Sequence, residues 1–291
     1  MYMQKREELH KVWIYFGLVA TAILVLFPML WTVSLSFKVP QDITCAVPKF
    51  IFKPTLDNYR HLFSIAKLSK SVGTTSLNFP RYFLNSLIIS GFGTLLSLLV
   101  GVPAGYALTR GKFKKSSTRE NIAFTLLSFW FGPEMAILLP LYKLYRTFGL
   151  MDSYIGLILL YQLIGVPFVV WMSRSYFLDI PVSIEDASLL DGYTRWQTFW
   201  RIDFPLVKPG IAATAVLTFI FEWNNFVFAL VVGGRHTMPV TTGALGFISY
   251  EAVLWGQMAG AIVISALPEI ILAIIVQKYM IRGLTFGAVR G

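Results

Sequence analysis

The chain has 291 residues, of which 56% are hydrophobic and only 14% charged, against about 25% charged in an average soluble domain. This composition excludes an ordinary soluble protein and indicates a membrane protein. The net charge of +10 fits basic cytoplasmic loops of a membrane protein better than nucleic-acid binding, and a single cysteine, Cys45, excludes a disulfide framework within the chain.

Six apolar stretches are long enough to cross a bilayer, for which a helix needs roughly 20 residues. The first lacks a small-residue cleavage site after its apolar core, so we interpret it as an uncleaved span rather than a signal peptide. The sequence therefore predicts an all-α membrane protein with one transmembrane domain over 1–291. Its spans are expected at about 12–37, 82–109, 121–142, 153–173, 211–234 and 252–277.

Basic residues indicate how these spans are oriented, because cytoplasmic loops carry an excess of Lys and Arg. If the amino terminus is cytoplasmic, the inside segments hold 15 basic residues and the outside segments 10. The short segment 110–120 alone holds five of them. We therefore expect both termini, and the polar segment 181–210, to face the cytoplasm.

The second span carries a small residue at every fourth position. These residues are Gly93, Ser97, Gly101 and Gly105. Small residues at this spacing let helices approach closely in membranes, so we expect the row to pack against another helix.

The segment 181–210 is a polar island between two apolar spans. Ser183 with Asp186, and Thr194 with Gln197, have the spacing of a helix-capping box. Between them Gly192 follows an aspartate, and glycine accepts the positive φ that often follows a helix end. Two short helices joined by a tight corner are therefore predicted, the second ended by Pro205.

An aromatic face is predicted on the second of these short helices. Trp196, Phe199 and Trp200 recur at i, i+3 and i+4, which places them on one side of a helix. The alternative is an ordinary amphipathic loop lying on the membrane surface.

The spacing of this island resembles the EAA loop of permease subunits from binding-protein-dependent ABC importers. That pattern is Glu-Ala-Ala, three residues, Gly, nine residues, then Ile-x-Leu-Pro. Here it reads Asp186-Ala187-Ser188, then Gly192, then Ile202 to Pro205, with both spacings kept. The departures are Asp186 for Glu, Ser188 for Ala and Phe204 for Leu.

The resemblance implies that this loop is a coupling helix which docks on a cytoplasmic ATPase. The residues it assigns to coupling are Glu185, Asp186, Ala187, Ser188, Gly192, Trp196, Ile202 and Pro205. It also implies a multi-pass protein of the bacterial inner membrane. Its expected partners are a second homologous permease, two ATPase subunits, a periplasmic solute-binding protein and the lipid bilayer.

Other short matches are similar to the MalG-like branch, which imports carbohydrates. They include Asn85-Ser86-Leu87, Trp223-Asn224 and the ending that starts at Gly283-Leu284-Thr285. The implied cargo is a sugar or oligosaccharide.

Intramembrane polar residues are the candidates for the substrate path. Glu222 leads them, because a charge near a helix centre costs roughly 2.5–3.5 kcal/mol on insertion scales and should face protein or water. Thr214, Thr218 and Asn225 share its helix face. The alternative is an inter-helix hydrogen-bond cluster that only holds the bundle together.

Three further positions enter the path hypothesis less directly. Asn224 adjoins the stripe, and Glu269 and Glu134 each follow a proline that frees a backbone carbonyl. For Glu134 a path role is the weaker expectation.

No nucleotide, metal or catalytic site is expected in this chain. The stretch from Gly105 to Lys112 fails the phosphate-loop pattern in spacing and at Phe113. Histidines occur only at His10, His61 and His236, without ligand or triad spacing. We therefore expect a transport subunit and not an enzyme, with ATP and Mg²⁺ bound by the ATPase partners.

Two alternatives and the choice of sugar stay open at this point. One alternative is an importer for an amino acid, a polyamine or phosphate, and the other is a secondary transporter working alone. The basic segment 38–81 is similar to what an importer of acidic oligosaccharides such as alginate would carry at its entrance. Glu222 and Glu269 favour the opposite.

Overall fold

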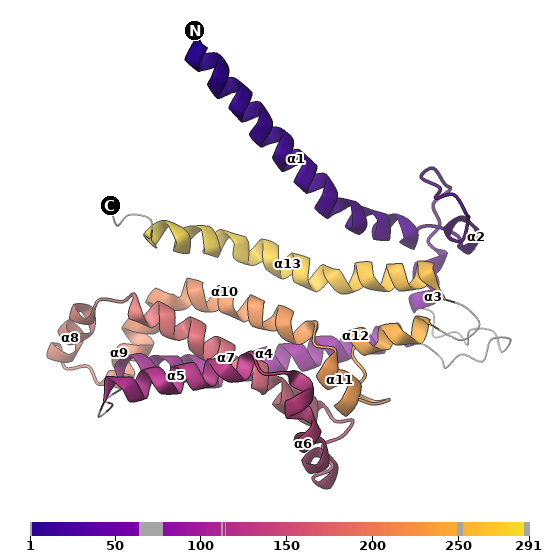
Figure 1. Ribbon diagram of the computed structural model, residues 1–291. Helices are drawn as coiled ribbons and strands as arrows, with labels where there is room; N and C mark the ends of the chain where they lie inside the picture. Colours follow the sequence, from indigo (N-terminus) through magenta and orange to yellow (C-terminus); the bar gives the residue numbers. More distant parts are fainter. Residues whose placement is uncertain (1, 64–77, 112, 114, 249–252, 288–291) are drawn as a thin grey trace. The chain divides into compact units, whose positions relative to one another are not determined.

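The computed structural model describes residues 2–63, 78–111, 113, 115–248 and 253–287 (Figure 1). In these residues the regular structure is helical, and the one strand-like feature is an antiparallel bridge between Ile248 and Val253. The predicted all-α class is confirmed. The chain divides into two compact units, residues 1–79 with 246–266 and residues 80–245 with 267–291.

In the first unit, the chain folds back on the end of its first helix. The Asn58 amide donates to the carbonyl oxygens of Ser36 at 2.9 Å and Lys38 at 2.8 Å. The Lys38 ammonium lies 4.1 Å from the centre of the Trp31 ring. The helices of this unit are α1 (Tyr2–Ser36), α2 (Pro40–Ile43), α3 (Asp57–Phe63) and the first part of α13 (Trp255–Gly287).

The second unit is a bundle of long helices with shorter ones at its ends. Its elements are α4 (Phe79–Arg110), α5 (Ser116–Trp130), α6 (Glu134–Thr147), α7 (Tyr154–Leu178), α8 (Val182–Leu190), α9 (Arg195–Thr198), the π-helix η1 (Phe199–Asp203), α10 (Phe204–Trp223), α11 (Val227–Val232), α12 (Val240–Gly243), the start of the 3-10 helix η2 (Ala244–Phe247) and the rest of α13.

Small residues bring α4 and α7 close together, as the fourfold spacing predicts. A Cβ added to Gly101 would lie 2.6 Å from a methyl carbon of Val169. One added to Gly105 would lie 3.0 Å from the backbone nitrogen of Arg174. The first distance is too short for a real Cβ and the second is tighter than most real Cβ contacts, so the close approach of the two helices favours glycine at both positions.

Two predicted spans are broken in the structure. α5 ends at Trp130 and α6 begins at Glu134, and the two helices are bent by 87°. Pro133 explains the break, because it offers no N–H and disfavours helical backbone at the preceding residue. α10 likewise ends at Trp223, and α11 begins at Val227.

Five helical stretches of the described chain are long and apolar enough to cross a membrane, or six if the bent α5–α6 pair counts as one. The positions of the membrane boundaries stay a prediction. The five stretches are His10–Ser36, Phe79–Arg110, Tyr154–Leu178, Arg195–Trp223 and Trp255–Gln277.

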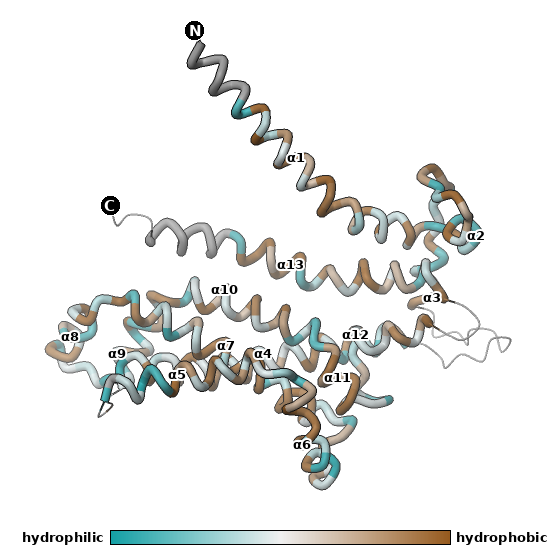
Figure 2. Tube along the Cα trace, viewed as in Figure 1, coloured by the Kyte–Doolittle hydropathy of each residue, from teal (hydrophilic) through white to brown (hydrophobic). Residues whose placement is uncertain are grey.

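The two ends of the second unit differ in character. α8 and α9 lie at one end, near the connection from α4 to α5, whereas α6 and α11 lie toward the other (Figure 1). Hydrophilic residues gather at the α4–α5 connection (Figure 2). The end of α4, the start of α5 and the island 181–210 therefore share one end of the bundle.

At the opposite end, two side chains tie the loop after α11 to the turn before α7 and to α4. The Asp152 carboxylate accepts from the backbone nitrogens of His236 at 3.1 Å and Thr237 at 3.0 Å, and from the Thr237 hydroxyl at 2.9 Å. The Asn85 amide donates to the carbonyl oxygens of His236 at 3.0 Å and Met238 at 2.9 Å.

Candidate functional site

The corner of the island 181–210 is a Schellman turn. Gly192 has φ +87°, a conformation that favours glycine. The backbone N–H of Gly192 donates to the carbonyl of Leu189 at 3.2 Å, and that of Tyr193 donates to the carbonyl of Ser188 at 3.1 Å. These are the two hydrogen bonds that define the motif. The tight corner predicted at Gly192 is present.

One of the two predicted capping boxes is confirmed and the other is wrong. The Thr194 hydroxyl accepts from the backbone N–H of Gln197, and the Gln197 side chain accepts from the backbone N–H of Thr194. By contrast, α8 begins at Val182 directly after Pro181, with no side-chain cap. Ser183 thus lies inside the first turn, because the fixed φ of Pro181 already favours the start of the helix.

The prediction that Pro205 ends the second short helix is also wrong. α9 continues through the π-helix η1 into α10, and Pro205 lies in the first turn of α10. The N–H of Phe204 donates to the carbonyl of Phe199, five residues back. Proline lacks the N–H that would bond the carbonyl four residues before it, and here the helix widens at that point instead of stopping.

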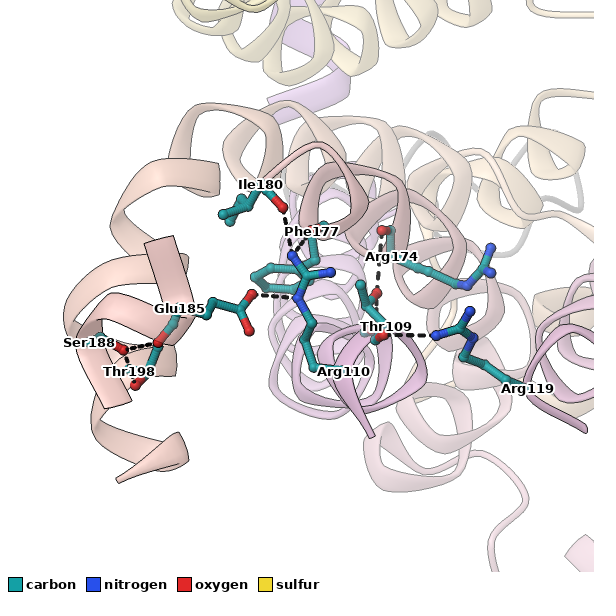
Figure 3. A network of polar contacts seen from close by, with 10 residues as sticks. Thr109, Arg110, Arg119, Arg174, Phe177, Ile180, Glu185, Ser188 and Thr198 are labelled. Atoms are coloured by element: carbon teal, nitrogen blue, oxygen red, sulfur yellow. Dashed lines mark hydrogen bonds and ion pairs between the residues drawn. The ribbon is translucent and has the colours of Figure 1, made fainter. Parts of the chain in front are cut away.

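Two adjacent acidic residues of α8 have opposite environments. Glu185 is only 6% exposed and forms an ion pair with Arg110, the last residue of α4 (Figure 3). Arg110 also donates to the carbonyl oxygens of Phe177 at 3.1 Å and Ile180 at 2.7 Å, at the end of α7. Asp186, the next residue, is exposed. One acidic side chain therefore holds α8 to the bundle, and the other faces outward.

Ser188, which departs from the motif, joins the two short helices. Its hydroxyl lies 2.8 Å from that of Thr198 and donates to the carbonyl of Glu185 at 2.7 Å (Figure 3). Both hydroxyl side chains are buried. An alanine at this position could not make the contact with Thr198, so the departure has a structural reason.

The aromatic side chains of the island form one cluster but differ in exposure. Trp196 stacks on Phe199 with ring centres 5.6 Å apart, and Trp200 lies 4.9 Å from Phe199. Phe199 is buried and packs on Tyr106 of α4 at 4.7 Å, whereas Trp196 and Trp200 stay exposed. The cluster thus seats the loop on α4 through Phe199 and leaves two indole rings outside.

The other motif residues lie around this cluster. Ala187 is exposed on α8, and Ile202 is half-buried in η1. Of the residues assigned to coupling, those that are exposed are Asp186, Ala187, Gly192, Trp196 and Pro205.

Glu222, the leading path candidate, lies inside the bundle. It is 1% exposed, and its carboxylate accepts from the hydroxyls of Thr94 at 3.3 Å and Ser97 at 3.2 Å on α4. Gly93 and Gly165 make room for it, because a Cβ at either position would collide with the carboxylate. Thr218, one turn earlier, is buried and donates to the carbonyl of Thr214 at 2.8 Å. A path role for these two residues stays a prediction.

The two asparagines at the end of α10 each bond a carboxylate on another helix. The Asn224 amide donates to Glu269 of α13 at 2.7 Å. The Asn225 amide donates to Glu134 of α6 at 3.1 Å, and its carbonyl oxygen accepts from the backbone N–H of Phe228 at 3.1 Å. Of the proposed path residues, Asn224 is the exposed one.

Sequence reasoning missed Arg110, Thr94 and Ser97 as partners of these sites. Arg110 entered only as one of five basic residues in a loop, and Ser97 only as a small packing residue. Their partners are 75 to 128 residues away in the chain. Such contacts leave no local spacing signal.

The sequence matches a known family of transport proteins. A model of the family "Binding-protein-dependent transport system inner membrane component" matches residues 93–285. A probable ABC transporter permease of Sinorhizobium fredii, y4oR, is 33% identical over 92% of both chains. The trehalose/maltose permease MalG of Thermococcus litoralis is 32% identical over 99% of both chains.

A solved structure has the same fold. It is a bacterial ABC transporter involved in the import of the acidic polysaccharide alginate, with a TM-score of 0.74 and 22% identity over 94% of this chain and 97% of the other. The helical membrane bundle and the sequence matches together define an ABC transporter permease, a transport subunit rather than an enzyme. The chain belongs to the family of inner-membrane components of binding-protein-dependent transport systems.

Proposed function

We propose that this chain is the permease subunit of an ATP-driven importer for a sugar or oligosaccharide. It would form the translocation path together with a second, homologous permease. Two ATPase subunits would bind ATP and Mg²⁺, and a periplasmic binding protein would deliver the sugar. The similarity to a trehalose/maltose permease over 99% of both chains supports a carbohydrate cargo, and the family match leaves no place for a stand-alone secondary transporter.

The observation that carries the coupling role is the split between Glu185 and Asp186. A docking helix must be fixed to its own subunit and still offer a surface to its partner. α8 meets both demands, because buried Glu185 pairs with Arg110 while Asp186 and Trp196 stay exposed. An amphipathic loop lying on the lipid surface has no need of a buried ion pair.

Reconstitution of the whole importer in proteoliposomes tests this function. Labelled trehalose, maltose and diacetylchitobiose are offered outside with the binding protein, and ATP is placed inside or left out. We expect accumulation of at least one sugar that requires ATP in the lumen. Uptake of an amino acid or polyamine in place of every sugar would contradict the carbohydrate assignment.

The proposed orientation places the island 181–210 and both termini in the cytoplasm. Single cysteines replace Phe148 and Leu190 in a Cys45→Ser background, since both side chains are largely exposed. An impermeant thiol reagent should label Phe148→Cys in spheroplasts and Leu190→Cys only in inside-out vesicles. Labelling of Leu190→Cys from outside would reverse the orientation and remove the ATPase-docking argument.

A further inference from the structure

A pocket lies where the two broken helices of the second unit meet. It is a half-open cavity of about 440 Å³ between the α5–α6 break and the α10–α11 break, within the roughly 300–1,000 Å³ typical of small-molecule sites. The hydrogen bond from Asn225 to Glu134 joins the two breaks at this pocket. Broken helices are also where other transporter folds place their substrates.

Aromatic rings form much of the pocket wall. Phe129, Trp130, Phe221 and Phe226 all line it. Trp130 stacks against Phe168 with ring centres 5.8 Å apart and meets Phe221 edge to face at 5.7 Å. This packing fixes the indole in place, so it is a rigid apolar surface of the kind that binds the C–H face of a sugar ring.

The polar edge of the pocket offers hydrogen-bond acceptors from Asn224 and Glu134. Both amide hydrogens of Asn224 are used, because its nitrogen donates to Glu269 at 2.7 Å and to the Ile220 carbonyl at 2.9 Å. Its carbonyl oxygen is left to accept. Glu134 takes one bond from Asn225 and, as a carboxylate, has further lone pairs. Sugar hydroxyls are donors that match such an edge.

The described lining of the pocket offers no cationic partner for an anionic sugar. Its described lining contains the carboxylate of Glu134 and no Lys, Arg or His side chain, and a second carboxylate, Glu269, lies behind Asn224. A uronate moved out of water needs a cation or several donors, and an unpaired charge in such a place is strongly disfavoured.

From the aromatic wall, the acceptor edge and the absence of a cation in the described lining, we infer that this pocket is a subsite for an uncharged sugar ring. The inference deepens the proposed function, on which it rests, because it assigns the permease itself a share in selecting neutral over acidic carbohydrates. The inference also implies that this chain carries a different class of cargo from the structural neighbour, whose cargo is an acidic polysaccharide.

Protection of a cysteine in the pocket tests the subsite in the purified complex. Phe129 and Phe124 are a matched pair, since both lie on α5 and are 57% and 69% exposed, but only Phe129 lines the pocket. Each is replaced by cysteine in a Cys45→Ser background, and the rate of maleimide labelling is measured. Phe226→Cys serves as a second reporter from the other break if Phe129→Cys does not fold.

We expect maltotriose or diacetylchitobiose to slow labelling at the pocket positions and to leave Phe124→Cys unaffected. A trisaccharide of uronates should give no protection. Glu134→Gln removes the carboxylate from the lining, so it should reduce the difference in protection between the neutral sugars and the uronate. Stronger protection by the uronate, equal protection of Phe124→Cys, or no protection by any of the sugars would overturn the assignment. Because labelling needs neither ATP nor the binding protein, failure here is distinguishable from failure of ATP-driven sugar uptake.

Discussion

Replacing Arg110 by alanine should release α8 from the bundle. Glu185 would then remain in a site where its side chain is only 8% exposed, without its ion-pair partner. Removing one partner of a buried pair costs about 3–5 kcal/mol. Because ~1.4 kcal/mol is a factor of ten, the opening equilibrium of α8 should shift at least about 100-fold.

Amide hydrogen exchange along α8 measures that opening directly. We expect the amides of Val182–Leu190 to exchange about 100-fold faster in Arg110→Ala, with ATP hydrolysis no longer controlled by the loaded binding protein. Arg110→Lys keeps the charge but loses the planar fork that reaches Phe177 and Ile180, so it should be intermediate.

The neighbouring acidic residue supplies the matched control. Asp186→Ala should leave exchange along α8 unchanged, because Asp186 is exposed, and should still weaken coupling if it faces the ATPase. Unchanged exchange in Arg110→Ala would refute the anchoring role of this ion pair. Accelerated exchange with fully controlled ATP hydrolysis would show that α8 is not the coupling element.

Three further measurements follow from other sites. Gly192→Val forces a positive φ on a branched residue at a cost of at least ~1–2 kcal/mol. Because nothing lies within 4 Å of the added Cβ, the subunit should still insert while coupling falls. Normal coupling in this variant would contradict the prediction. Glu222→Ala removes two buried hydrogen bonds worth on average ~0.6 kcal/mol each in membranes, so thermal stability should fall only slightly, and if Glu222 lines the path transport should fall far more. A matched fall of both would identify an inter-helix contact instead. At Asp152, burial opposes ionisation, but bonds from His236 and Thr237 outweigh it and lower its pKa below 3.8. Its stabilisation is therefore present above pH 3.8 and lost as the pH falls through the lower folded value, so exchange of the His236 amide should accelerate there in the wild type and show no such step in Asp152→Asn.

Local chemistry in the island was largely predictable from the sequence. The Gly192 corner and the Thr194 capping box depend on residues within five positions of each other, and both are present. Prolines were harder to interpret. Pro205 was expected to end a helix and instead lies in the first turn of one, whereas Pro133 separates two helices by a sharp bend. The two prolines differ in local backbone: a π-helix leads into the turn that holds Pro205, whereas Pro133 is itself extended and precedes α6.

The environment of each carboxylate could not be predicted. Glu185 and Asp186 are adjacent and chemically alike, yet one is buried because Arg110 lies opposite and the other faces outward. Glu222 was correctly expected to avoid lipid, but the choice between a path and the bundle interior depends on Thr94, Ser97 and two glycines from other helices. Burial of a polar group is decided by tertiary contacts, which the order of residues along one helix does not contain.

The position of Arg110 at the very end of α4 has a mechanical consequence. Asn85, near the other end of the same helix, bonds the backbone of the loop after α11. The helix rises about 38 Å over the 25 steps from Asn85 to Arg110 (110 − 85). α4 is thus one helix held at one end to α8 and at the other to the loop after α11, with Pro103 inside it as the point where it bends most easily. We expect a displacement of α8 that keeps the ion pair to bend α4 near Pro103 or to move that distant loop.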